Sequence, residues 1–106
     1  MVKGEIVLIP FPFTDLSGIK NRPALVLVDG EDDITVSFIT TQLKWQDEMD
    51  IKVESSKENG LKRTSLIRLS KLATIDKALV IGRLGNLSNE DLATVDNKLS
   101  KLFKLK

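Results

Sequence analysis

Five consecutive apolar residues, at positions 24–28, follow directly after the dipeptide Arg22-Pro23. A short apolar run without polar alternation is typical of a strand that is buried on both faces. The proline ring disfavours helical backbone angles in the residue before it, so Arg22 is held in an extended conformation. This stretch therefore predicts a buried strand with a guanidinium at its start, preceded by a polar loop at residues 14–21.

Several further segments have the character of strands. Branched apolar side chains, or an alternation of apolar and polar ones, occur at residues 4–9, 34–41, 51–54, 65–69 and 78–83. Because proline cannot donate a hydrogen bond to a β-ladder, we expect Pro10 to end the first of these strands. Residues 73–76 are predicted to be extended or to form a short turn.

The last predicted element is an amphipathic helix. Ser88 is a suitable N-cap, and Asp91 places a carboxylate three residues later. The apolar side chains that follow share one helical face; they are Leu92, Val95, Leu99, Leu102 and Phe103. Many short strands and one helix indicate a mainly β domain over residues 1–106, with a curved antiparallel sheet closed or nearly closed into a small barrel.

Composition excludes several kinds of site. The chain has no cysteine, which rules out disulfides and thiolate metal sites, and no histidine, which rules out histidine-based zinc sites and Ser-His dyads. The net charge of +1 does not by itself indicate a nucleic-acid binder, although separate basic segments could converge in space. The longest apolar run, at residues 6–13, is too short to span a membrane, and we expect a cytoplasmic protein.

Two stretches resemble the MazF/PemK family of toxin endoribonucleases. The first is GEIVLIPFPFTDLSG at residues 4–18 together with RPALVL at 22–27, and the second is ITTQ at 39–42. Residues 65–76 agree as well. The resemblance implies an SH3-like barrel of the MazF/PemK/CcdB type with a C-terminal helix. It also implies a homodimer, sequence-selective cleavage of single-stranded RNA without metal or cofactor, and a cognate antitoxin that blocks the dimer.

The resemblance assigns catalysis to Arg22 and Thr40. The fork of donors on an arginine matches two phosphate oxygens, and Thr40 would add a hydroxyl donor. The register of the second motif favours Thr40 over its neighbour Thr41. In some members an Arg-x-Asp pair follows in a later strand, but here Ser70 stands where the carboxylate would be. The RNA-binding candidates are Asp15, Ser17, Gly18, Lys20, Thr41, Gln42 and Arg68.

The chemistry that these residues allow is attack by the 2′-hydroxyl of RNA, which leaves a 2′,3′-cyclic phosphate and a 5′-hydroxyl. An obvious general base is missing; Asp15 is the candidate, and a slow enzyme is expected. Phe11 and Phe13 are predicted to pack in the core or in a dimer rather than against bases. Two other functions stay open: a non-catalytic barrel that binds a protein such as gyrase, and a degenerate toxin that only sequesters an antitoxin.

Overall fold

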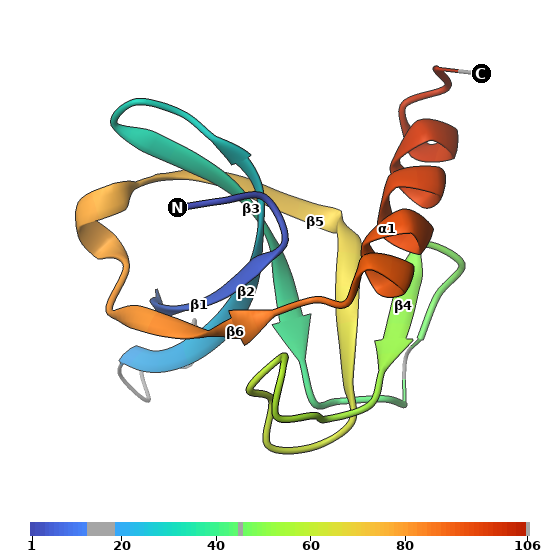
Figure 1. Ribbon diagram of the computed structural model, residues 1–106, viewed down its shortest axis with the longest axis horizontal. Helices are drawn as coiled ribbons and strands as arrows, with labels where there is room; N and C mark the ends of the chain where they lie inside the picture. Colours follow the sequence, from blue (N-terminus) through green and yellow to red (C-terminus); the bar gives the residue numbers. More distant parts are fainter. Residues whose placement is uncertain (13–18, 45, 106) are drawn as a thin grey trace.

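A computed structural model describes residues 1–12, 19–44 and 46–105. Within these residues, one antiparallel sheet of six strands has the order β4-β5-β3-β2-β1-β6 and curves into a half-barrel beside a single α-helix (Figure 1). The elements are β1 Glu5–Pro12, β2 Ile19–Asp29, β3 Asp33–Thr40, β4 Asp50–Val53, β5 Ser65–Asp76, the 3₁₀-helix η1 Lys77–Leu79, β6 Gly82–Asn86 and α1 Asn89–Leu102. The predicted mainly β architecture with a C-terminal helix is confirmed. Strands β4 and β6 stand at opposite ends of the sheet, so the barrel is not closed.

Strand β1 continues through its prolines, so the prediction that Pro10 ends it is wrong. Pro10 pairs with Asn21 of β2, and the ladder extends to Pro12. On the other side of β1, the carbonyl oxygen of Leu8 accepts a hydrogen bond of 2.8 Å from the amide of Ile81. Backbone groups alternate in direction along a strand, so both proline nitrogens face the β6 side. Pairing with β6 has already ended at Leu8, and no ladder bond is lost.

Strand β5 is a single long strand that bends in its middle. Ser37 of β3 pairs with Leu72, but the next residue, Phe38, pairs with Arg68, so residues 69–71 have no partner in β3. Extra residues on one side of a ladder bend the strand and redirect its side chains. The extended alternative for residues 73–76 is therefore confirmed, and these residues belong to the same strand as residues 65–69.

The last strand begins later than the predicted position 78. Asp76 accepts a hydrogen bond of 2.8 Å from the amide of Ala78 and caps a 3₁₀ turn there, so β6 begins at Gly82. In the same turn, Lys77 Nζ lies 2.9 Å from Asp29 Oδ1. This hydrogen bond holds the pKa of Asp29 below its ordinary value.

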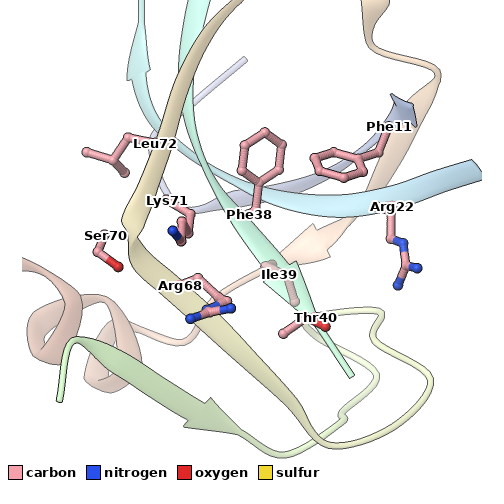
Figure 2. Close-up of a pocket in the computed structure, with 9 residues that line it drawn as sticks. All are labelled: Phe11, Arg22, Phe38, Ile39, Thr40, Arg68, Ser70, Lys71 and Leu72. Atoms are coloured by element: carbon pink, nitrogen blue, oxygen red, sulfur yellow. The ribbon is translucent and has the colours of Figure 1, made fainter. Parts of the chain in front are cut away.

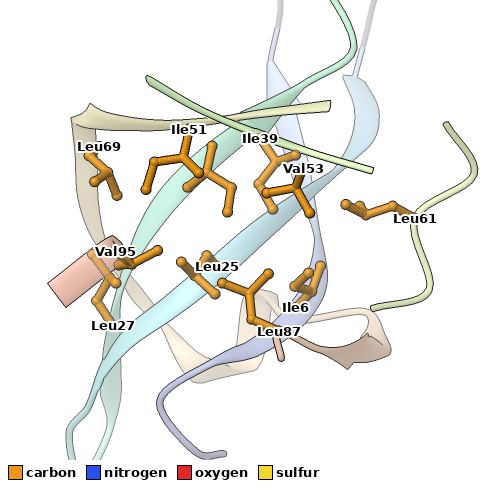
Figure 3. Packing of buried hydrophobic residues seen from close by; sticks show 11 residues of the cluster. Ile6, Leu25, Leu27, Ile39, Ile51, Val53, Leu61, Leu69, Leu87 and Val95 are labelled. Carbon is orange, nitrogen blue, oxygen red and sulfur yellow. The ribbon is translucent and has the colours of Figure 1, made fainter. Parts of the chain in front are cut away.

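Two apolar clusters cover the two faces of the sheet. The run in β2 supplies both, because Leu25 and Leu27 face one cluster while Ala24 and Val26 face the other. Burial on both faces is thus confirmed for this run, except at Val28, which is 55% exposed. The first cluster (Figure 3) contains Ile6, Leu25, Leu27, Ile39, Ile51, Val53, Leu61, Ile67, Leu69, Leu87 and Val95. The second cluster contains Val7, Ile9, Ala24, Val26, Ile34 and Val36.

Helix α1 closes over the first cluster. Its N-cap is as predicted: Ser88 Oγ accepts a hydrogen bond of 3.1 Å from the amide of Asp91. Val95 is fully buried, whereas Phe103 lies just beyond the last helical residue and is 55% exposed, contrary to its predicted place on the apolar face. Lys98 Nζ donates hydrogen bonds to two backbone carbonyls at residues 48 and 50, which fastens the helix to the start of β4. No helix in the described part of the chain is long and apolar enough to cross a membrane.

Candidate functional site

A pocket of about 530 Å³ lies beside the bend in β5. Strands β1, β2, β3 and β5 all contribute to its walls, so it joins segments that are far apart in the sequence (Figure 2). Bulges commonly redirect side chains next to active sites, and here residues 70 and 71 of the bulge belong to the lining. The lining consists of Phe11, Arg22, Phe38, Ile39, Thr40, Arg68, Ser70, Lys71 and Leu72.

Arg22 reaches the pocket because of strand periodicity. Side chains alternate between the two faces of a strand, so Arg22 points to the same face as Ala24 and Val26 of the second cluster. The pocket borders that cluster through Phe38, and it borders the first cluster through Ile39 and Leu72. Strand β2 begins at Ile19, so Arg22 lies inside the strand, opposite Ile9 of β1, and not at its start as predicted. A ladder on the β1 side holds its backbone.

Thr40 occupies the last position of β3, on the same face as Phe38. Its Oγ1 accepts a hydrogen bond of 3.1 Å from the amide of Gln42. The hydroxyl oxygen is thereby oriented by backbone, while the hydroxyl hydrogen can be donated to a bound group. In the view of Figure 2, Thr40 lies between Arg22 and Arg68. Thr41 is exposed and does not line the pocket, which supports the choice of Thr40.

Arg68 enters the pocket from β5 and is held by two carboxylates. Its Nε lies 3.3 Å from Oδ1 of Asp50, and its Nη2 lies 3.6 Å from Oδ2 of Asp47. The Asp50 side chain is fully buried, whereas that of Asp47 is 50% exposed. The carboxylate partners of Arg68 therefore come from a different part of the chain and not from position 70.

An aromatic pair forms the apolar wall of the pocket. The rings of Phe11 and Phe38 meet edge to face, with centroids 5.0 Å apart and planes at 74°. Edge-to-face contact is a favoured geometry for aromatic rings and fixes both side chains. Phe38 was not predicted as a site residue, although its position two residues before Thr40 places both on one strand face. Phe11, predicted to pack in the core or in a dimer, lines the pocket as well.

The pocket thus combines cationic groups with a flat apolar wall. Arg22, Arg68 and the exposed Lys71 bring positive charge, and Thr40 brings a hydroxyl. Such a surface suits a ligand that has both an anionic group and a planar ring. In the described residues, no group of His, Cys, Asp and Glu side chains could hold a metal ion.

Comparison with known proteins shows the family of this chain. Residues 2–103 match the family model of the PemK-like, MazF-like toxins of type II toxin-antitoxin systems. The chain belongs to this MazF/PemK family. A probable endoribonuclease MazF of Mycolicibacterium smegmatis is 26% identical over 84 residues, which are 76% of this chain and 77% of that protein.

Solved structures of MazF toxins have the same fold. An endoribonuclease in complex with its cognate antitoxin, from mycobacterial species, superposes with a TM-score of 0.77 at 14% identity, covering 100% of this chain and 97% of the other. The Mycobacterium tuberculosis toxin MazF-mt6 gives a TM-score of 0.73 at 19% identity, covering 94% of this chain and 98% of the other. The barrel fold that the resemblance implied is thereby confirmed.

The structure of this MazF/PemK chain brings together only some of the predicted site residues. Arg22, Thr40 and Arg68 share the pocket, whereas Lys20, Thr41 and Gln42 do not line it. Gln42 still contributes through its backbone amide, which orients Thr40. The candidates Asp15, Ser17 and Gly18 lie outside the described residues. Lys71 was missed, and the only signal for it was its place in the same basic segment as Arg68.

Proposed function

We propose that this chain is a metal-independent endoribonuclease toxin that cleaves single-stranded mRNA at selected sequences. In this proposal it acts in the cytoplasm as a homodimer and is neutralised by a cognate antitoxin protein. The observation that supports it most is the placement of Arg22 and Thr40 in one pocket with two more cations. Relatives named as endoribonucleases, one of them in complex with an antitoxin, support it as well.

The reaction would be an internal transfer at phosphorus. The 2′-oxygen forms a new bond to the adjacent phosphorus, the bond from phosphorus to the 5′-oxygen breaks, and the products are a 2′,3′-cyclic phosphate and a 5′-hydroxyl. The 2′-hydroxyl proton passes to a base, for which Asp15 is the candidate, and the leaving 5′-oxygen takes a proton from solvent. Arg22 and Thr40 would donate hydrogen bonds to the phosphate oxygens on which negative charge builds up. One donor placed in this way contributes about 3 kcal/mol.

The direct test is cleavage of a long single-stranded RNA by the purified protein in excess EDTA. The expected result is a small set of fragments with 2′,3′-cyclic phosphate ends, identified by their resistance to phosphatase until acid opens the ring. Fragments with 3′-hydroxyl ends would contradict the proposed reaction. RNA that stays intact at high protein concentration would contradict the endoribonuclease function itself.

Replacement of Thr40 by valine should slow cleavage about tenfold, because an isosteric methyl group removes a hydrogen bond to a charged phosphate oxygen, worth about 1.5 kcal/mol. Thr40→Ser keeps the hydroxyl and should retain most of the activity. Thr41→Val is the matched control, because Thr41 is exposed and outside the pocket. Single-turnover rates with the same RNA measure all three. Equal losses in Thr40→Val and Thr41→Val would contradict a role for the Thr40 hydroxyl.

The aromatic wall is expected to hold a base. A base stacked on an aromatic ring gains about 1–3 kcal/mol, so Phe38→Leu should raise the Kd for single-stranded RNA about tenfold. Leucine keeps most of the apolar volume but offers no ring face. Phe103→Leu makes the same exchange at an exposed position outside the pocket and should leave the Kd unchanged. Fluorescence anisotropy with a labelled 2′-O-methyl oligonucleotide, which cannot be cleaved, measures both.

A further inference from the structure

The two carboxylates that hold Arg68 differ in burial and in distance, and this difference suggests separate roles. Building on the proposed RNA-cleaving function, we propose that Asp50 is a positioning residue that fixes Arg68 in the pocket. We propose further that Asp47 competes with an RNA phosphate for the same guanidinium. Figure 2 shows the Arg68 side chain in the pocket, near Thr40 and Lys71.

The environment of Asp50 suits a residue that holds Arg68 in one position. Its side chain is 0% exposed, and both of its oxygens are used: Oδ1 lies 3.3 Å from Arg68 Nε, and Oδ2 accepts a hydrogen bond of 3.0 Å from the amide of Asp47. Asp50 and Arg68 are also direct partners in the β4–β5 ladder. A buried carboxylate that loses its cation is strongly destabilised, so Asp50 keeps the Nε edge of Arg68 in place.

The surroundings hold the backbone on both sides of this ion pair. Lys98 Nζ donates to the carbonyl oxygens of residues 48 and 50, at 3.0 and 3.2 Å. On the opposite side, Oγ of the buried Ser37 donates a hydrogen bond of 2.7 Å to the carbonyl oxygen of Arg68. Helix α1 and strand β3 therefore restrain the two residues of the ion pair from opposite directions.

Asp47 has the opposite character. Its carboxylate is 50% exposed and lies 3.6 Å from Arg68 Nη2, so the pair is an exposed and weak one. A guanidinium has five donors, and a phosphate with two suitable oxygens takes a pair of them. An incoming phosphate can therefore displace Asp47 from Nη2, while Asp50 retains Nε. Until then, the negative charge of Asp47 lowers the affinity of the pocket for anions.

The test is a matched pair of isosteric substitutions. Relative to wild type, Asp47→Asn should lower the Kd for an uncleavable 2′-O-methyl RNA oligonucleotide about threefold, because it removes a competitor bound by an exposed ion pair. Asp50→Asn should raise the Kd about tenfold, because Arg68 loses its fixed partner. The control is Asp96→Asn, which removes one negative charge, as Asp47→Asn and Asp50→Asn do. Asp96 is 52% exposed, outside the pocket and paired with Lys3 at 2.7 Å, and its replacement should change the Kd less than Asp47→Asn.

Two further variants separate positioning from damage to the fold. Lys98→Met removes the hydrogen bonds that Lys98 donates to the carbonyl oxygens of residues 48 and 50, and it leaves no charge buried. It should raise the Kd about twofold to threefold, because the backbone at Asp50 is then held less firmly. In an Arg68→Gln background, Asp47→Asn should lose its effect, since the competition requires the guanidinium. A general loss of structure would not produce shifts of opposite sign.

Binding and cleavage are scored separately, so the two proposals can fail independently. Opposite shifts of the Kd in a protein that leaves RNA intact would sustain the roles of Asp47 and Asp50 and refute the reaction. Cleavage that persists while Asp47→Asn and Asp96→Asn behave alike would refute only the competition. Shifts of the same sign in both pocket variants, or no RNA binding by any of the proteins, would also overturn the inference.

Discussion

Replacement of Arg22 by alanine is expected to lower the single-turnover rate of RNA cleavage about 10³-fold. A charged donor that is placed in advance stabilises the transition state more than the bound substrate, and removal of one such donor typically costs a factor of 10²–10³. Arg22 is paired with Ile9 of β1, and the ladder with β3 begins two residues later at Ala24, so its backbone needs little reorganisation when RNA binds. The measurement is the decay of a labelled oligonucleotide in EDTA with protein in excess.

Two further variants test this expectation. Arg22→Lys keeps the charge but loses the planar fork, and it should recover only part of the rate. Arg83→Ala is the matched control, because Arg83 is 55% exposed in β6, pairs with Glu5 at 2.6 Å and does not line the pocket. It should cleave as wild type does. If Arg22→Ala were as active as Arg83→Ala, the assigned role of Arg22 would be wrong.

The second large effect concerns stability. Leu25→Ala should lower the free energy of unfolding by about 3 kcal/mol, because Leu25 is 0% exposed in the first cluster and its truncation leaves a cavity there. For a domain of this size, such a loss lowers the Tm by about 15 °C. Thermal and urea unfolding followed by circular dichroism measure both quantities.

The control for Leu25→Ala is the same exchange at an exposed position. Leu105 is 69% exposed, so Leu105→Ala should change the free energy of unfolding by less than about 0.5 kcal/mol. Similar losses in the two variants would mean that the first cluster does not stabilise the fold as the structure indicates.

Much of the fold could be predicted from the sequence because it depends on local patterns. The alternation along β3 and the uniform run in β2 follow directly from which faces are buried. The cap at Ser88 follows from a side-chain hydrogen bond within one turn. Arg22 and Thr40 are different: no spacing rule brings them together, and their shared pocket was expected only from the family resemblance.

The features that escaped prediction depend on contacts between distant segments. Pro10 stays within a strand only because its nitrogen faces a side of β1 where pairing has already ended. The bend that places Lys71 at the pocket arises from the register of β5 against β3. Asp50 reaches Arg68 across the β4–β5 ladder, and Asp47 reaches it from the residues just before β4. None of these leaves a periodic signal in the residues concerned.

The part of β5 before its bend has a consequence for how the site can be shut off. Ile67 is paired on both sides, with Ile39 in β3 and Ile51 in β4, and all three side chains belong to the first cluster. Separating these three residues means breaking two ladders and the first cluster at once, so the amide proton of Ile67 should exchange with deuterium only when the whole molecule unfolds. Because Ile39 also lines the pocket, we expect the site to be shut off by a partner that covers its opening, and not by a change in this part of the sheet.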